Sequence, residues 1–239
     1  LQNRQGAPYR VFTPFWKRLL ECGLPQSPVE VPTLEGRLLE PVLRDGAPGC
    51  RLEDLGLLPE VPWDQGLARA WRPSRAGALA RLDEFIATDL DRYAHGRELP
   101  AADQVSRLSP YLHFGQIGPR EIVRACRGQP HAAADFLREL GWREFAHHLL
   151  FHFPHTSDAP MDERFEAFPW REDGVALRAW QRGETGIPLV DAGMRQLWAT
   201  GWMHNRVRMV VASFLTKNLL LPWQAGARWF WDTLVDADL

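Results

Sequence analysis

The sequence predicts an all-α fold, and three observations indicate it. After residue 75, apolar residues recur three and four positions apart, which is the spacing of one face of a helix. Proline or glycine marks several ends of these apolar stretches, as is typical of helix boundaries. The chain shows no alternating apolar and polar pattern of the length that a strand needs, and no internal repeat.

The first predicted helices extend from the amino-terminal region to the middle of the chain. Short helices are expected over residues 13–22 and 65–69. Residues 77–92 form the next helix, because their apolar side chains fall on one side of it. Pro119 suits the first turn of a helix that begins at Gly118. A long helix is then expected over residues 132–151.

Three more helices are predicted in the last third of the chain. Residues 187–199 form a helix that begins near Pro188 and ends before Gly201, a residue suited to cap a carboxyl terminus. One continuous helix is expected over residues 202–221, where Pro222 stops it. The last helix covers residues 223–234.

The chain divides into two parts by composition. Proline and glycine interrupt residues 1–75 repeatedly, so we interpret this part as an interdomain connector. Residues 76–239 are expected to form the helical domain itself. Because the chain opens without an initiating methionine or a first strand, we expect it to be part of a longer protein.

The composition is that of an ordinary globular protein, with 45% hydrophobic and 24% charged residues. No uninterrupted apolar stretch reaches the roughly 18 residues that a membrane span requires, so no membrane association is expected. The odd, scattered set of Cys22, Cys50 and Cys126 argues against a disulfide framework or a zinc site. We therefore expect a cytoplasmic protein that binds no metal.

The charge is unevenly distributed, although the formal net charge is only −2. Between residues 192 and 231 the sequence has no acidic residue but five basic ones, Arg195, Arg206, Arg208, Lys217 and Arg228. A local basic patch can bind a phosphate backbone on a nearly neutral protein. The alternative, a chance run on solvated helix faces, is the one that charge alone favours.

A first candidate site surrounds Ser106, Arg107 and Ser109, with Tyr93 and Arg97 upstream. Two hydroxyls and a guanidinium in a turn before a helix suit a phosphate group, because several donors converge and no acid repels it. A serine-rich loop that caps the next helix explains the same residues. The residues alone leave both interpretations open.

A second candidate site lies on the predicted helix over residues 132–151. Glu139, Trp142, Arg143 and Ala146 share one face of it, at positions i, i+3, i+4 and i+7. A flat indole between a carboxylate and a guanidinium is what a pocket for a flat base needs. The alternative is a half-buried tryptophan beside a salt bridge.

A third group, Asn205, Arg208 and Met209, also shares a helix face by its spacing. An amide, a guanidinium and a thioether suit the lining of a heterocyclic ligand, since methionine adapts to flat rings. His204 has no other metal-ligand types around it, so we expect a structural histidine with its hydrogen bonds satisfied.

A fourth group, Asp236 and Asp238, lies near the end of the last predicted helix, where the helix dipole disfavours carboxylates. A cation should offset them, and Arg208 is the candidate. The alternative is a frayed polar terminus.

Several stretches resemble, in order, the motifs of the photolyase/cryptochrome family: residues 106–115 (SRLSPYLHFG), 136–145 (FLRELGWREF), 185–195 (TGIPLVDAGMR), 200–209 (TGWMHNRVRM) and 236–239 (DADL). Residues 9–18 (YRVFTPFWKR) are similar to the family's interdomain connection. The resemblance implies the family's multi-helix FAD-binding domain, truncated at both ends. An antenna chromophore would then bind an N-terminal α/β domain that this chain lacks.

The resemblance also implies roles for individual residues. Non-covalently bound FAD would be held by Tyr93, Ser106, Arg107, Leu108, Ser109, Arg208, Asp236, Ala237 and Asp238. DNA would be bound by Arg97, Glu139, Trp142, Arg143, Asn205 and Arg206, and the catalytic set would be Glu139, Trp142, Asn205 and Met209. Val105 stands where the family often has threonine. Trp223 and Trp170 resemble the middle and outer members of the family's electron-relay tryptophans.

The function that the resemblance implies is the light-driven repair of cyclobutane pyrimidine dimers in DNA, a carbon–carbon lyase reaction in which reduced FAD donates an electron to a flipped-out dimer. Asn205 and Met209 favour cyclobutane dimers, because relatives that repair (6-4) photoproducts have histidine at both positions. The alternatives are a cryptochrome-type blue-light photoreceptor without repair activity and a helical fragment without flavin. We expect a monomer whose partner is dimer-containing DNA.

Overall fold

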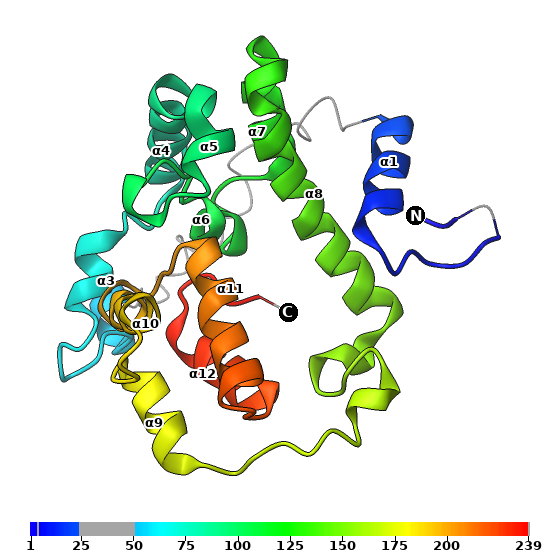
Figure 1. The fold of residues 1–239 in the computed structure, drawn as a ribbon. Helices are drawn as coiled ribbons and strands as arrows, with labels where there is room; N and C mark the ends of the chain where they lie inside the picture. Colours follow the sequence, from blue (N-terminus) through cyan, green and yellow to red (C-terminus); the bar gives the residue numbers. More distant parts are fainter. Residues whose placement is uncertain (4, 24–50, 239) are drawn as a thin grey trace, which may run out of the picture.

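The computed structural model describes residues 1–3, 5–23 and 51–238, and in this part of the chain all regular structure is helical (Figure 1). The predicted all-α fold is therefore confirmed. Cys50 and the middle of the predicted connector lie outside the described residues. Among the described helices, none is long and apolar enough to cross a bilayer.

The first seven labelled helices run from the amino terminus to the long helix that crosses the molecule. They are α1 (Phe12–Cys22), α3 (Gln65–Ala70), α4 (Arg75–Thr88), α5 (Tyr93–Gly96), α6 (Ser109–His113), α7 (Pro119–Ala125) and α8 (Pro130–His152). Short 3₁₀ turns lie at Leu52–Leu55, Leu90–Arg92, Pro100–Ala102 and Cys126–Gly128, and two more follow α8 at Pro154–Ser157 and Glu163–Phe165.

The second set of helices comprises α9 (Gly174–Arg182), α10 (Pro188–Thr200), α11 (Asn205–Ser213) and α12 (Trp223–Thr233), with a π-helical turn at Phe214–Asn218. The expected end of α10 is confirmed, because Gly201 follows it with a left-handed φ of 67°. The α9 helix was not predicted. It begins where the side chain of Asp173 accepts hydrogen bonds from the N–H groups of Val175 and Ala176.

The predicted continuous helix over residues 202–221 is wrong at its start. Trp202, Met203 and His204 precede α11, because Nδ1 of His204 accepts a hydrogen bond from the N–H of Arg206, 3.2 Å away, and caps the helix. The predicted helix over residues 77–92 is also shorter, since α4 ends at Thr88 and a 3₁₀ turn follows.

The helices pack around two main apolar cores. One core joins α4 to α8 and includes Phe85, Leu108 and Ile122. The other joins α9 to α12 around Trp180, which is fully buried and whose Nε1 donates to the carbonyl of Val211. In Figure 1, α8 crosses the molecule with α1 on one side of it and α11 and α12 on the other.

Candidate functional site

An open hollow of about 560 Å³ lies between α5, α8 and α11. Trp142 comes from α8 and Met209 from α11, and both line this hollow with about half of each residue exposed. The complete lining is Ala94, Arg97, Glu98, Asp135, Arg138, Glu139, Trp142, Asn205, Arg206 and Met209. An aromatic ring and a thioether among charged groups give this hollow both stacking and hydrogen-bonding capacity.

Two smaller cavities of about 200 and 280 Å³ share much of their lining beside this hollow, and we refer to them together as the inner cavities. Both are lined by Tyr93, Ser106, Leu108, Ser109, Glu139, Arg208 and Asp236. Tyr93, Ser106 and Ser109 of the first candidate site therefore lie beside Asp236 of the fourth. Ala237 follows Asp236 and donates its N–H to the carbonyl of Leu234.

Three residues line both the open hollow and the smaller inner cavity: Arg97, Glu139 and Asn205. The guanidinium of Arg97 donates to Oε1 of Glu139 at 2.6 Å, and the two side chains are only 16% and 28% exposed. A charge-assisted hydrogen bond with this little exposure is stronger than an ordinary surface pair. It forms a polar partition between the two spaces.

The loop over residues 105–109 is held in a defined conformation. The guanidinium of Arg81 donates to the carbonyls of Val105 and Ser106, at 2.7 and 2.9 Å. Arg107 has a left-handed φ of 52°, and its guanidinium lies 4.8 Å above the ring of Trp202. Burial raises the pKa of Tyr93 to about 12, so its phenol stays protonated and can donate a hydrogen bond.

Arg208 and Met209 face different spaces, although their spacing predicts one shared face with Asn205. Arg208 lines only the inner cavities, where it donates to Oδ2 of Asp236 at 2.9 Å and to the carbonyl of Met203 at 2.8 Å. Met209 lines only the open hollow, and Asn205 lines both spaces. The hydrogen bonds of Arg208 turn its side chain away from Met209.

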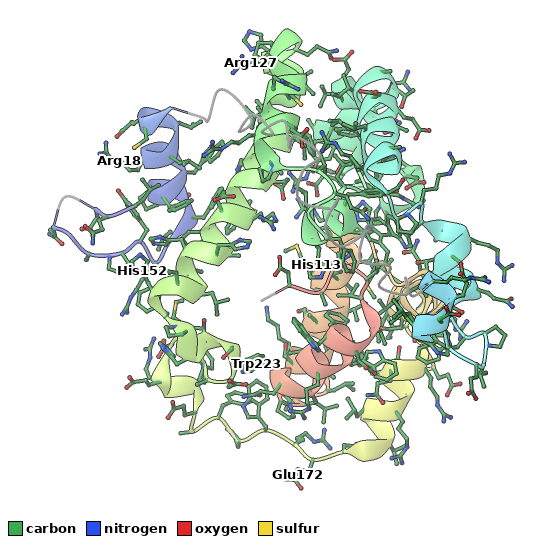
Figure 2. All side chains as sticks on the ribbon, turned by 180° about the vertical axis from the view of Figure 1, so that it is seen from behind. Arg18, His113, Arg127, His152, Glu172 and Trp223 are labelled. Atoms are coloured by element: carbon green, nitrogen blue, oxygen red, sulfur yellow. The ribbon has the colours of Figure 1, made fainter. Side chains whose placement is uncertain are left out.

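Two further arginines of the predicted DNA-binding set have carboxylate partners. Arg206 lines the open hollow and forms a two-point ion pair with Glu98, which lowers the pKa of Glu98 and raises that of Arg206. Arg143 lines the larger inner cavity instead, 3.6 Å from Asp238. Nδ1 of His113, near the middle of the molecule in Figure 2, lies 3.9 Å from the same oxygen of Asp238.

The two tryptophans expected to relay electrons lie away from these cavities. Trp170 packs on Phe168 in the loop before α9, with ring centroids 4.4 Å apart. Trp223 begins α12 and is labelled in Figure 2. The N–H of Arg171 donates to the carbonyl of Leu220, which brings the Trp170 loop against the segment that leads to Trp223.

Comparisons with known proteins identify the family of the chain. Residues 136–239 match the family described as "FAD binding domain of DNA photolyase". The chain is 46% identical over 244 residues to the deoxyribodipyrimidine photo-lyase of Agrobacterium fabrum (strain C58), covering 100% of this chain and 50% of that protein. It is 40% identical over 250 residues to Cryptochrome-2 of Arabidopsis thaliana, covering 98% of this chain and 40% of that protein. The chain belongs to the photolyase/cryptochrome family.

A solved structure supports the same assignment for the fold. The crystal structure of a bacterial class III photolyase from Agrobacterium tumefaciens matches with a TM-score of 0.85 and 42% identity, covering 100% of this chain and 50% of that one. This photolyase/cryptochrome chain thus spans about half the length of the curated relatives that it matches.

The inner cavities of this photolyase/cryptochrome chain fit FAD, the cofactor of the matched domain. Hydroxyl donors from Tyr93, Ser106 and Ser109 suit its phosphates. The carboxylates of Glu139 and Asp236 line the same cavities, where Arg97 and Arg208 offset their charges. The buried Oδ1 of Asp236 has no hydrogen-bond partner among the described residues. A donor group on a bound ligand would supply the hydrogen bond that Oδ1 lacks.

Sequence reasoning missed several residues at this site. His204 was expected to have its hydrogen bonds satisfied, and this is wrong, because its buried Nε2 has no partner within the described ranges. Glu98 was not predicted, since its partner Arg206 lies 108 positions away. Trp202 was not predicted either, because its cation–π contact with Arg107 depends on the extended backbone before α11.

Proposed function

We propose that this chain forms the FAD-binding and lesion-binding part of an enzyme that repairs cyclobutane pyrimidine dimers in DNA with light. One observation carries the proposal. Trp142 and Met209, from different helices, line a single open hollow that only a polar partition separates from the inner cavities. A flat lesion in the hollow and a flavin behind it would be near neighbours, as electron transfer between them requires.

The open hollow suits two adjacent pyrimidines of one strand that are joined covalently. A cyclobutane dimer stacks poorly in the duplex, so flipping it out costs less free energy than flipping an intact base. Trp142 offers an exposed ring for stacking, and Met209 offers an apolar surface opposite it. Glu139 and Asn205 provide acceptors and donors for the polar edge of the lesion.

The basic residues around the hollow suit the flanking phosphates. Arg97 and Arg206 line it directly, and both guanidiniums already bind carboxylates that phosphate groups would compete with. Arg143 lies on the flavin side, beside Asp238, so we assign it to cofactor positioning rather than to DNA. The partner in this proposal is dimer-containing DNA, bound by a cytoplasmic monomer.

The inner cavities would hold FAD through Tyr93, Ser106, Arg107, Leu108 and Ser109, with Arg208, Asp236, Ala237 and Asp238 at the other end. When bound and reduced, FAD would supply light-activated electron transfer to the dimer. The hydroxyl-bearing residues would hold the phosphates, and Arg208 fixes the carboxylate of Asp236. Trp223 and Trp170 remain the proposed route for electrons from the surface.

A second candidate function is a blue-light photoreceptor without repair activity. The identity with Cryptochrome-2, which extends over nearly the whole chain, favours it as a specific alternative. Both functions need FAD in the inner cavities, but only repair needs a lesion in the open hollow. A helical protein without flavin is the third possibility.

The test mixes the chain with FAD, removes unbound cofactor and records the absorbance spectrum. The reduced holoprotein is then illuminated with blue light in the presence of an oligonucleotide that carries one cyclobutane thymine dimer, and the intact thymines formed are quantified. We expect retained flavin and light-dependent loss of the dimer. Flavin without repair supports the photoreceptor, and the absence of a flavin spectrum contradicts both flavin-dependent functions.

A further inference from the structure

The ring of Trp142 rests on a residue far away in the sequence. Phe12 of α1 stacks on it with ring centroids 3.7 Å apart and an interplanar angle of 10°. Phe12 is only 5% exposed and does not line the open hollow. It therefore covers part of the indole from outside, while Trp142 itself stays 44% exposed and lines the hollow.

Phe12 in turn packs against a second aromatic ring of α1. Trp16, one turn further along α1, lies nearly parallel to Phe12, at 6.1 Å and 13°. Trp16 reaches α8 at Gly141, where any added Cβ atom would clash with its indole. The rings of Trp16, Phe12 and Trp142 are thus nearly parallel and follow one another in this order. Trp16 packs on α8 at Gly141, directly beside Trp142.

A second contact fixes the edge of the indole. Phe145 meets Trp142 edge to face, at 5.9 Å and 72°, and it packs against Phe12 in the same way, at 5.8 Å and 66°. A half-exposed tryptophan without such neighbours would sample several rotamers, and immobilising it on binding would cost conformational free energy. Here the ring is already immobilised before any ligand arrives.

We infer that Phe12 is a positioning residue that holds the ring of Trp142 in the orientation that receives the flat face of a pyrimidine dimer. The inference rests on the proposed lesion-binding function of the open hollow. Phe12 acts through Trp142 and does not touch the ligand. Phe12 therefore affects the preference for damaged over undamaged DNA, because an undamaged duplex places no base in the hollow.

The experiment compares Phe12→Leu with Phe15→Leu in the FAD-loaded chain. Both phenylalanines lie on α1, both are at least 95% buried, and both contact Phe145, but only Phe12 stacks on Trp142. Binding is measured for a duplex with one cyclobutane thymine dimer and for the same undamaged duplex, and the ratio of the two Kd values is the readout. We expect Phe12→Leu to reduce this preference roughly two- to tenfold, as loss of one aromatic stack implies, and Phe15→Leu to leave it unchanged.

Three further variants separate positioning from general packing. Phe12→Tyr keeps the ring and should retain the preference, while Phe12→Met, which stays apolar but flexible, should lose it if Phe12→Leu does not fold. In a Trp142→Leu background, Phe12→Leu should cause no further loss. An unchanged preference in Phe12→Leu, or an equal loss in Phe15→Leu, overturns the inference. A wild-type chain that shows no preference for the dimer overturns the proposed function itself, and the inference with it.

Discussion

Arg208 of α11 and Asp236, three residues beyond the end of α12, form an ion pair with 2.9 Å between Nη2 and Oδ2. The side chain of Asp236 is 1% exposed, while that of Arg208 is 25% exposed. Burying a carboxylate costs free energy, because the charge loses its contact with water, unless a cation lies beside it. The pair therefore links the carboxyl-terminal segment to α11 at the inner cavities.

Replacing Arg208 by methionine should destabilise the fold strongly, because it leaves the charge of Asp236 buried without a cation. We expect the free energy of unfolding in urea to fall by about 3 kcal/mol, at the low end of the range for buried pairs since Arg208 is partly exposed. Arg164→Met is the matched control, because its partner Asp162 lies on the surface and an exposed pair contributes little to stability. Equal losses in the two variants would contradict the role of burial.

Glu98→Gln should strengthen DNA binding. It keeps the shape of the side chain but removes the negative charge that competes with phosphate for Arg206. The pair is a third to a half exposed, so we expect a modest gain of about two- to fivefold in affinity and a salt dependence steeper by roughly one phosphate contact. The measurement is binding of undamaged duplex over a series of salt concentrations.

Glu21→Gln on α1 is the control for that prediction, because Glu21 also pairs with an arginine, Arg18, at 3.1 Å and the change in net charge is the same. It lies outside the lining of the open hollow. If both variants bind DNA equally more tightly, the gain comes from net charge and not from Arg206.

The stability of the chain should decrease as the pH falls below about 6.5, in part through His148. Burial lowers the pKa of His148 below its ordinary value of 6.5, and the neighbouring His152 lowers it further. The unfolded chain then takes up the proton first, so the contribution is complete above pH 6.5 and is lost as the pH falls towards the folded-state pKa. The neutral ring accepts the N–H of Tyr9 at 3.1 Å, which ties the start of the chain to α8.

His148→Gln should reduce this pH dependence, because glutamine can accept the same hydrogen bond without titrating. Thermal midpoints of both proteins, measured between pH 8 and 5, check the prediction. Burial also lowers the pKa of His204, so a part of the pH dependence should persist in the variant. A variant whose midpoint falls as steeply as that of the wild type would show that His148 does not contribute.

Gly141→Ala should destabilise the chain, although alanine in a helix interior ordinarily stabilises by about 1 kcal/mol relative to glycine. The added Cβ atom would clash with the indole of Trp16, so α1 must shift away from α8. We expect a loss of about 1–3 kcal/mol in urea unfolding and an altered near-ultraviolet circular dichroism spectrum. Gly128→Ala is the control, because a Cβ atom there meets nothing within 4 Å.

The sequence predicts the parts of this structure that depend on local spacing. The placement of Glu139 and Trp142 on one face of α8 follows from their separation of three residues, and both line the open hollow. The extended stretch before α11 could not be predicted in this way, because the apolar pattern continues through Trp202 and Met203. Contacts such as Phe12 with Trp142 join residues 130 positions apart, and nothing in either local pattern indicates the other.

The partition of Arg97 and Glu139 has a thermodynamic consequence. Because the same two charges border both the open hollow and the inner cavity, occupants of the two spaces cannot act on them independently. A molecule in one space that attracts the guanidinium of Arg97 leaves the negative charge of Glu139 less neutralised, and an occupant of the other space meets that charge. The affinities of the two sites are therefore linked, and each occupant must change the binding of the other by the same factor.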